Sequence, residues 1–214
     1  RNEKRFLKVF NQADLLAFRS HTLLRRYSKL FPYRDCNRDF VAASGIGDMF
    51  YSLIHHSKDK NLTRDKIRIV TVASLKALKQ IDMVLRVLSR ISNFDWDYTI
   101  IGDGEERESL EMLSKELGIA DRVSFRGFVP HDTVAKEVIH YDLFVMVSIR
   151  ETFGLVYLEA MAAGCIVLGA KGRGIDGVIQ DGINGFLCDP EDDEDLYLNL
   201  KKIFELDSKQ WEEI

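Results

Sequence analysis

A single glutamate lies in an otherwise apolar segment, and its carboxylate needs a hydrogen-bond donor or a cation as a partner. Residues 151–164 read ETFGLVYLEAMAAG, and the stretch from Phe153 to Ala163 has the composition of a helix. A helix that is apolar nearly all round is normally buried, yet this one carries Glu159. An unpaired carboxylate is costly to bury. A ribose would offer two hydroxyl donors to Glu159; a buried Arg or Lys, or backbone amides, would satisfy it equally well.

A second glutamate, Glu151, precedes the same helix and follows the apolar run DLFVMVS at 142–148. That run lacks alternation, which predicts a strand covered on both faces. Gly154 would let backbone N–H groups at the helix start come close to a ligand, and a helix start favours a phosphate. This stretch therefore predicts an anion- and hydroxyl-binding site at the carboxyl end of a strand.

Strands and helices alternate regularly from residue 67 onward. We expect strands at 67–74, 97–102, 123–128, 142–148, 165–170 and 185–189. We expect helices at 79–92, 105–118, 131–141 and 153–163, around 176–180 and after Pro190. This order predicts an α/β fold, a Rossmann-like parallel sheet with helices on both faces. Ligands of such sheets bind beyond the carboxyl ends of the strands, here residues 73–74, 102–104, 127–128, 148–151 and 170–174.

Residues 1–58 follow another pattern, with a strand, a helix and a strand expected at 11–18, 20–31 and 37–44. We interpret them as the remnant of an N-terminal domain and its hinge, and 59–214 as a C-terminal domain. Since the chain begins with Arg1 and stops in mid-pattern, we expect a fragment. Residues 1–34 hold nine Lys or Arg against two acids. Solvated helix faces explain this charge; peripheral contact with the inner face of a membrane is a further hypothesis.

Composition excludes several classes of function. The chain has 214 residues, 46% hydrophobic and 30% charged, with a net charge of −4, which gives no indication of nucleic-acid binding. No run of about 20 apolar residues is present. Three cysteines, Cys36, Cys165 and Cys188, have no metal or disulfide spacing. We therefore expect a cytoplasmic protein.

Two motifs that resemble ligand sites are rejected. IGDGEE at 101–106 lacks the third glycine of a dinucleotide fingerprint, and its acids would repel a phosphate. Asp95 and Asp97 have the spacing of a metal clamp, but they precede a strand and so lie at the wrong edge of the sheet. We expect no metal site and no cofactor.

Several ordered motifs resemble one known family. Ser148-x-x-Glu151-x-Phe153-Gly154 with Glu159-A-M-A-x-Gly164 looks like the E-x7-E signature of retaining GT-B glycosyltransferases of group 1. The runs at 102–130 and 181–192 match the same family in order and spacing. The resemblance covers about residues 67–206. It implies two Rossmann-like domains facing across a cleft, of which the C-terminal one binds a nucleotide-sugar donor.

The resemblance also implies roles for individual residues. Glu151 would be catalytic and bind hydroxyls of the transferred sugar, and Glu159 would hold the ribose. The remaining donor-binding residues would supply backbone amides, a phosphate-binding lysine and the lining of the base pocket: Phe153, Gly154, Leu155, Lys79, Phe128 and Val129.

The implied activity is hexosyl transfer with retention, without a metal, as in polysaccharide biosynthesis. The donor would be a UDP- or GDP-sugar, and a saccharide or lipid-linked saccharide acceptor would bind through the N-terminal domain. We expect this chain alone to be inactive, because the acceptor half of the cleft is absent.

Two positions depart from the family pattern. Ser74 stands where the family has a phosphate-binding Arg, and Gly177 where it has a Glu. A non-catalytic, nucleotide-binding subunit is therefore one alternative. A sugar-phosphate epimerase or phosphorylase on the same fold is another; an epimerase would need an acid or base such as His131, which we expect instead to begin a helix.

Overall fold

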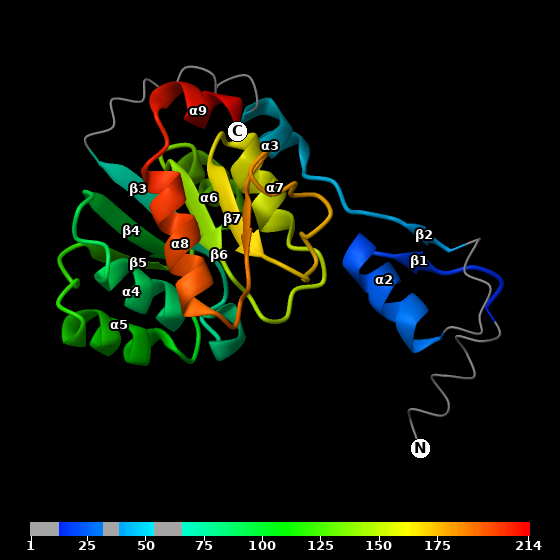
Figure 1. Ribbon diagram of the computed structural model, residues 1–214, viewed down its shortest axis with the longest axis horizontal. Coiled ribbons are helices and arrows are strands. Elements are labelled where there is room, and N and C mark those ends of the chain that lie inside the picture. The colour runs from blue at the N-terminus through cyan, green and yellow to red at the C-terminus, as the bar shows by residue number, and fades with distance from the viewer. Residues whose placement is uncertain (1–12, 32–38, 54–65) are drawn as a thin grey trace.

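The computed structural model describes residues 13–31, 39–53 and 66–214. Its centre is a six-stranded, all-parallel sheet in the order β5-β4-β3-β6-β7-β8 (Figure 1). The strands are β3 (Ile67–Val72), β4 (Trp96–Ile101), β5 (Val123–Gly127), β6 (Leu143–Met146), β7 (Ile166–Ala170) and β8 (Phe186–Cys188). Counted along the chain from β3, the order is 3-2-1-4-5-6, the doubly wound Rossmann arrangement. The predicted fold class is thus confirmed.

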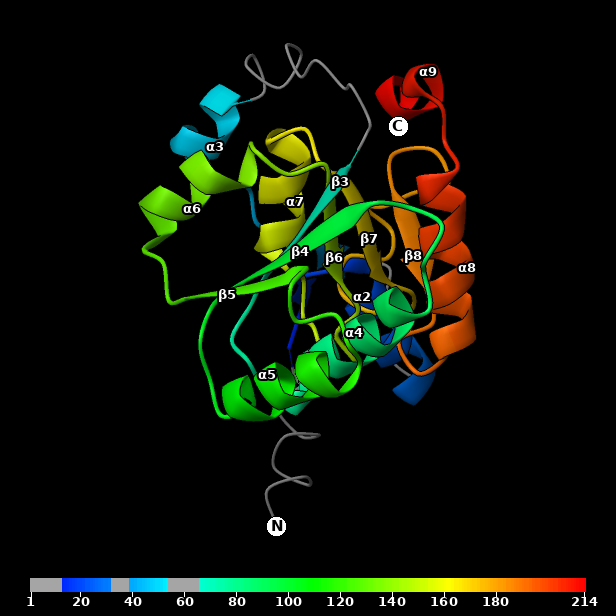
Figure 2. The same ribbon diagram turned by 90° about the vertical axis from the view of Figure 1, so that its left-hand side faces the viewer.

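Helices cover both faces of the sheet. They are the short 3-10 turn η2 (Ala77–Lys79), α4 (Ile81–Ser89), α5 (Arg107–Glu116), α6 (His131–Val138), α7 (Leu155–Ala162), α8 (Asp193–Phe204) and α9 (Ser208–Glu213). Figure 2 shows α4, α5 and α8 on one face and α6 and α7 on the other.

Each face has its own hydrophobic core. Ile69 and Leu168 belong to the core under α4, α5 and α8, whereas Val70 and Val167 belong to the core under α6 and α7. Neighbouring residues of one strand are therefore buried on opposite faces. This explains why β6 and β7 read as continuous apolar runs rather than alternating ones.

The N-terminal part has the predicted strand–helix–strand order within the described residues. β1 (Ala17–Phe18) and β2 (Phe40–Val41) pair in parallel around α2 (His21–Leu30), set apart from the main sheet in Figure 1. The next helix, α3 (Asp48–Leu53), packs against α6 and α7. The predicted boundary at residue 58, together with Cys36, lies outside the described residues.

Two predicted helices were wrong in detail. Residues 176–180 form turns with an isolated bridge between Asp176 and Ile179, because Gly177 has a φ of 107°, which no helix accommodates. The helix expected from residue 79 begins at Ile81, because Gln80 is left-handed with a φ of 55°. Within the ranges described above, no helix is both long and apolar enough to cross a membrane.

Candidate functional site

The candidate site lies where β3 and β6 run side by side at the centre of the sheet. From this point strands are added in opposite directions, and the following helices α4 and α7 lie on opposite faces. In this architecture ligands usually bind at such a point, beyond the carboxyl ends of the two strands. The loops that follow these strands are residues 73–80 and 147–154.

Hydrogen bonds fix the two loops to each other. The Ser148 hydroxyl donates to the Leu78 carbonyl oxygen at 3.0 Å, and the Ile149 amide donates to the same oxygen at 3.0 Å. Sequence analysis quoted Ser148 in the motif but gave it no role. Its side chain is fully buried and joins the loop that carries Lys79 to the loop that carries Glu151.

Lys79 and Glu151, the predicted phosphate and sugar ligands, are in contact. Lys79 Nζ lies 2.8 Å from Glu151 Oε2, and the two side chains are only 15% and 18% exposed. An ammonium has three N–H donors, so this contact leaves two for a ligand. The other carboxylate oxygen, Oε1, accepts from the Thr152 amide at 3.1 Å. The structure thus holds a cation and an anion together beyond the carboxyl ends of β3 and β6.

Gln80 was missed by sequence analysis. Among the described residues it is the one non-glycine with a positive φ, and its side-chain amide donates to the Pro190 carbonyl at 2.9 Å. Strained backbone of this kind persists where the surroundings enforce it, and it concentrates at ligand sites. Nothing in the sequence signals it, because glutamine has no preference for that conformation.

The loop before Lys79 rests on the glycines of the rejected dinucleotide motif. A Cβ on Gly102 would lie 1.8 Å from the Ala73 carbonyl oxygen, and one on Gly104 would lie 2.4 Å from that of Leu75. The Leu75 amide donates to the Asp103 carbonyl at 2.9 Å. These glycines therefore allow close contact between two backbones.

Gly154 shapes the start of α7. It has a φ of 80°, and a Cβ there would lie 2.5 Å from the Tyr157 ring. The Tyr157 hydroxyl donates to the Met146 carbonyl at 2.6 Å, which anchors the helix to the end of β6. Burial, with a further contribution from Glu151, raises the pKa of Tyr157 well above its ordinary value. Tyr157 therefore remains a neutral donor. Phe153 is buried, and Leu155 is the first helical residue.

Glu159 has a protein partner that sequence analysis did not consider. Its Oε1 lies 2.9 Å from Nε2 of His131, and among the described residues no lysine, arginine or backbone amide donates to this carboxylate. Glu159 is 8% exposed. His131 begins α6, as predicted, and its side chain is 63% exposed. The only signal was the sequence Pro130-His131 after a strand, which fixes a helix start but not a contact.

The predicted base-pocket residues follow the edge strand β5. Phe128 is 78% exposed, while Val129 packs against the core under α6 and α7. The structure gives no contact between them and Lys79 or Glu151.

Both departures from the family pattern are on the surface. Ser74 is exposed, and no described residue pairs with the ammonium of the neighbouring Lys76. Gly177 faces α2: a Cβ there would lie 3.2 Å from Cβ of His21. The carbonyl of Asp176 accepts from the Thr22 hydroxyl at 3.1 Å. A larger residue at 177 would therefore press on α2.

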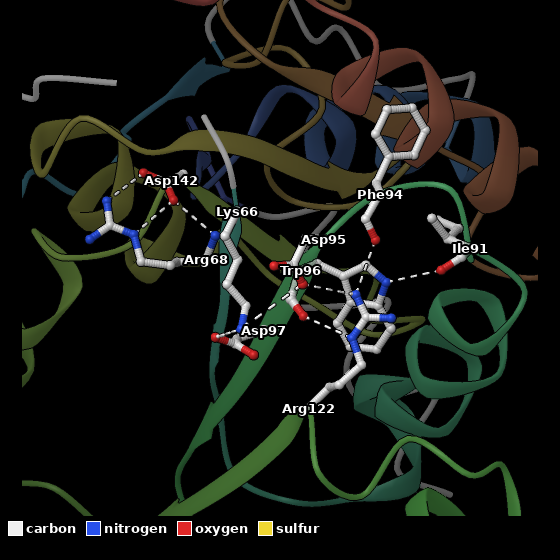
Figure 3. Close-up of polar contacts among 9 residues, drawn as sticks. All are labelled: Lys66, Arg68, Ile91, Phe94, Asp95, Trp96, Asp97, Arg122 and Asp142. Atoms are coloured by element: carbon white, nitrogen blue, oxygen red, sulfur yellow. Dashed lines mark hydrogen bonds and ion pairs between the residues drawn. The ribbon is translucent and has the colours of Figure 1, made fainter. Parts of the chain in front are cut away.

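The Asp95–Asp97 pair is occupied by cations of the protein, as Figure 3 shows. Asp97 lies 2.8 Å from Lys66, and Asp95 lies 3.6 Å from Arg122. In the described part of the chain no three His, Cys, Asp or Glu side chains gather as metal ligands would.

The strand order defines a Rossmann-like α/β domain, and the comparisons give its family. Residues 54–213 match the family described as glycosyl transferases group 1, and the chain belongs to this family. The N-acetyl-alpha-D-glucosaminyl L-malate synthase of Bacillus anthracis is 30% identical over 186 residues, 85% of this chain and 48% of that protein. The D-inositol 3-phosphate glycosyltransferase of Thermomonospora curvata is 32% identical over 153 residues, 66% of this chain and 36% of that protein.

Solved structures confirm the fold. HepE of Anabaena in complex with UDP and glucose superposes with a TM-score of 0.78 at 22% identity, over 99% of this chain and 59% of that one. The chain thus spans about half the length of the relatives it matches. The matching family is one of glycosyl transferases, which does not favour the epimerase, phosphorylase or non-catalytic alternatives.

Proposed function

We propose that this chain is the donor-binding part of a retaining glycosyltransferase that uses a UDP- or GDP-sugar. The observation that carries the proposal is the Lys79–Glu151 pair, held at 2.8 Å beyond the carboxyl ends of β3 and β6, before the start of α7. A site for a sugar diphosphate needs a cation for the phosphates and an acceptor for sugar hydroxyls. Here one of each is prepositioned by the tie between the two loops.

The chemistry of such a transfer explains each part. Negative charge develops on the diphosphate as the glycosidic bond breaks, and fixed cations and amides stabilise it. Lys79 and the backbone amides of Phe153, Gly154 and Leu155 would do so without a metal. Glu151 would accept hydrogen bonds from the sugar, and Glu159 from the ribose. The exposed Lys76 would take the place of the arginine that Ser74 replaces.

The base would lie against Phe128 and Val129 at the end of β5. The acceptor, a saccharide or lipid-linked saccharide, would bind across the cleft in the N-terminal domain, to which residues 1–58 belong. We expect no transfer by residues 1–214 alone, because holding acceptor and donor together supplies much of such a rate. Peripheral contact of the whole protein with the inner face of a membrane is part of the same proposal.

Calorimetric titration with UDP, GDP, ADP and NAD, first without metal and then with Mg²⁺, tests this function. We expect one of the two nucleotides UDP and GDP to bind without metal, and NAD not to bind. A preference for NAD, or a strict requirement for Mg²⁺, would contradict the proposal.

A further inference from the structure

Glu159 and His131 form a contact between two helices. They lie on α7 and α6, neighbouring helices on one face of the sheet (Figure 2). An ionised carboxylate can only accept hydrogen bonds, so Nε2 of His131 must be the donor to Glu159 Oε1. No described residue donates to the second oxygen, Oε2. One carboxylate oxygen is therefore hydrogen-bonded, and the other is available to a ligand.

The ring of His131 packs against a second aromatic side chain. Its ring lies 5.1 Å, centroid to centroid, from the ring of Phe50, which is fully buried on α3. The carbonyl of Pro130 accepts from the amides of Thr133 and Val134 at 2.8 and 3.0 Å, which fixes the backbone at the start of α6. His131 thus brings a rigid donor to a carboxylate that would otherwise rotate about its side-chain bonds.

We propose that His131 is a positioning residue that orients Glu159 for the ribose and makes the site selective for ribonucleotides. The inference rests on the proposed function, because it takes Glu159 as the ribose ligand. By binding Oε1, the imidazole fixes the plane of the carboxylate and leaves Oε2 for the 2′- and 3′-hydroxyls. A nucleotide without those hydroxyls gains nothing from this arrangement.

The test measures how strongly His131 and the ribose hydroxyls depend on each other. UDP and 2′,3′-dideoxy-UDP are titrated into the wild-type chain and into the His131→Ala and His131→Gln variants, and GDP with its dideoxy form is used in the same way. Gln carries an N–H donor near the place of Nε2. His140→Ala is the matched control, because His140 is exposed in the turn after the same helix and none of the described contacts involves its ring.

We expect the wild type to bind the ribonucleotide about tenfold more tightly than the dideoxy form, as loss of a hydrogen bond to a charged group implies. His131→Ala should lose about tenfold for the ribonucleotide and little for the dideoxy form, so the preference disappears. His131→Gln should restore most of it, and His140→Ala should change nothing. Thermal unfolding should show all variants folded.

The other outcomes separate the two proposals. If His131→Ala keeps the full preference, the positioning role is overturned while the donor site stands. If the wild type has no preference, Glu159 does not bind ribose. If the wild type binds neither nucleotide, the proposed function fails, and this inference fails with it.

Discussion

Lys66 pairs with Asp97 at the amino edge of the sheet, and Lys79 pairs with Glu151 at the carboxyl edge, both at 2.8 Å. The first pair is 42% and 45% exposed; the second is 15% and 18% exposed. An exposed pair contributes little to stability, and a partly buried pair costs desolvation that its attraction must offset. The two edges therefore hold ion pairs of the same length, but the pair at the carboxyl edge is less exposed to solvent.

The surroundings of the pairs differ as well. At the amino edge Arg122, beside Asp95, donates to the carbonyls of Trp96 and Phe94, and its guanidinium carbon lies 3.8 Å from the centroid of the Trp96 ring (Figure 3). At the carboxyl edge Glu151 pairs with Lys79 and accepts from the Thr152 amide, next to two left-handed residues, Gln80 and Gly154. The charged groups of the carboxyl edge are thus less exposed and lie beside constrained backbone, a combination found at ligand sites.

The largest expected effect is on stability at the amino edge. Asp142 is buried and accepts three hydrogen bonds from Arg68, at 2.8, 2.9 and 2.8 Å. Asp142→Ala leaves the Arg68 amide unpaired and should lower the free energy of unfolding by about 3 kcal/mol, measured by urea denaturation. Asp97→Ala, at an exposed pair, should cost about 0.5 kcal/mol. Weaker UDP binding by a folded Asp142→Ala variant would show that the amino edge also contributes to the ligand site, which would contradict the comparison.

Replacing the lysine at each edge tests which of the two ion pairs belongs to the ligand site. Lys79→Met should weaken UDP binding about thirtyfold, or roughly 2 kcal/mol, because a charged hydrogen bond to phosphate is lost. Uridine, which has no phosphate, should be unaffected. Lys66→Met is the matched control and should leave UDP affinity unchanged in calorimetry. Equal losses in both variants would show that only net charge matters.

Glu159→Gln should have a smaller effect, about tenfold on UDP affinity, since an amide is a weaker acceptor for the ribose than a carboxylate. The fold should persist, because the amide oxygen still accepts from His131. Calorimetry and thermal unfolding measure the two quantities. Unchanged affinity, or collapse of the fold, would assign Glu159 a purely structural role.

The smallest effect concerns the tie between the loops. Ser148→Ala removes the hydroxyl bond to Leu78 while the Ile149 amide bond remains. We expect a loss of about 1 kcal/mol in the free energy of unfolding, with UDP affinity lowered about threefold because Lys79 is less firmly placed. A change in stability alone would mean that the other contacts suffice to place Lys79.

The architecture was predictable from sequence, because continuous apolar runs and helical periodicity repeat along the chain. The position proposed for the site rests on the same reasoning, since Glu151 comes three residues after the run 142–148 that contains β6. The contacts within the candidate site could not be predicted from the sequence. Spacing along the chain gives no distance between Lys79 and Glu151, 72 residues apart, or between His131 and Glu159, 28 apart.

The errors in predicting individual helices arose from single residues. Gly177 and Gln80 interrupt helices that composition favours, and only the backbone angles reveal this. The glycines of 102–104 resemble a ligand motif but serve backbone contact. Position along the strand was the better guide: Asp95, just before β4, and Asp97, its second residue, are paired with cations of the protein.

The most direct test of the whole account is a titration of the ¹⁵N-labelled chain with UDP, followed by amide chemical shifts, with GDP as the second ligand. We predict that shifts move at residues 74–80, 128–131 and 151–159, and that those of Lys66, Asp95, Asp97, Arg122 and Asp142 stay in place. Movement confined to the amino edge, or no movement with either nucleotide, would contradict the assignment of the carboxyl edge as a nucleotide-sugar site.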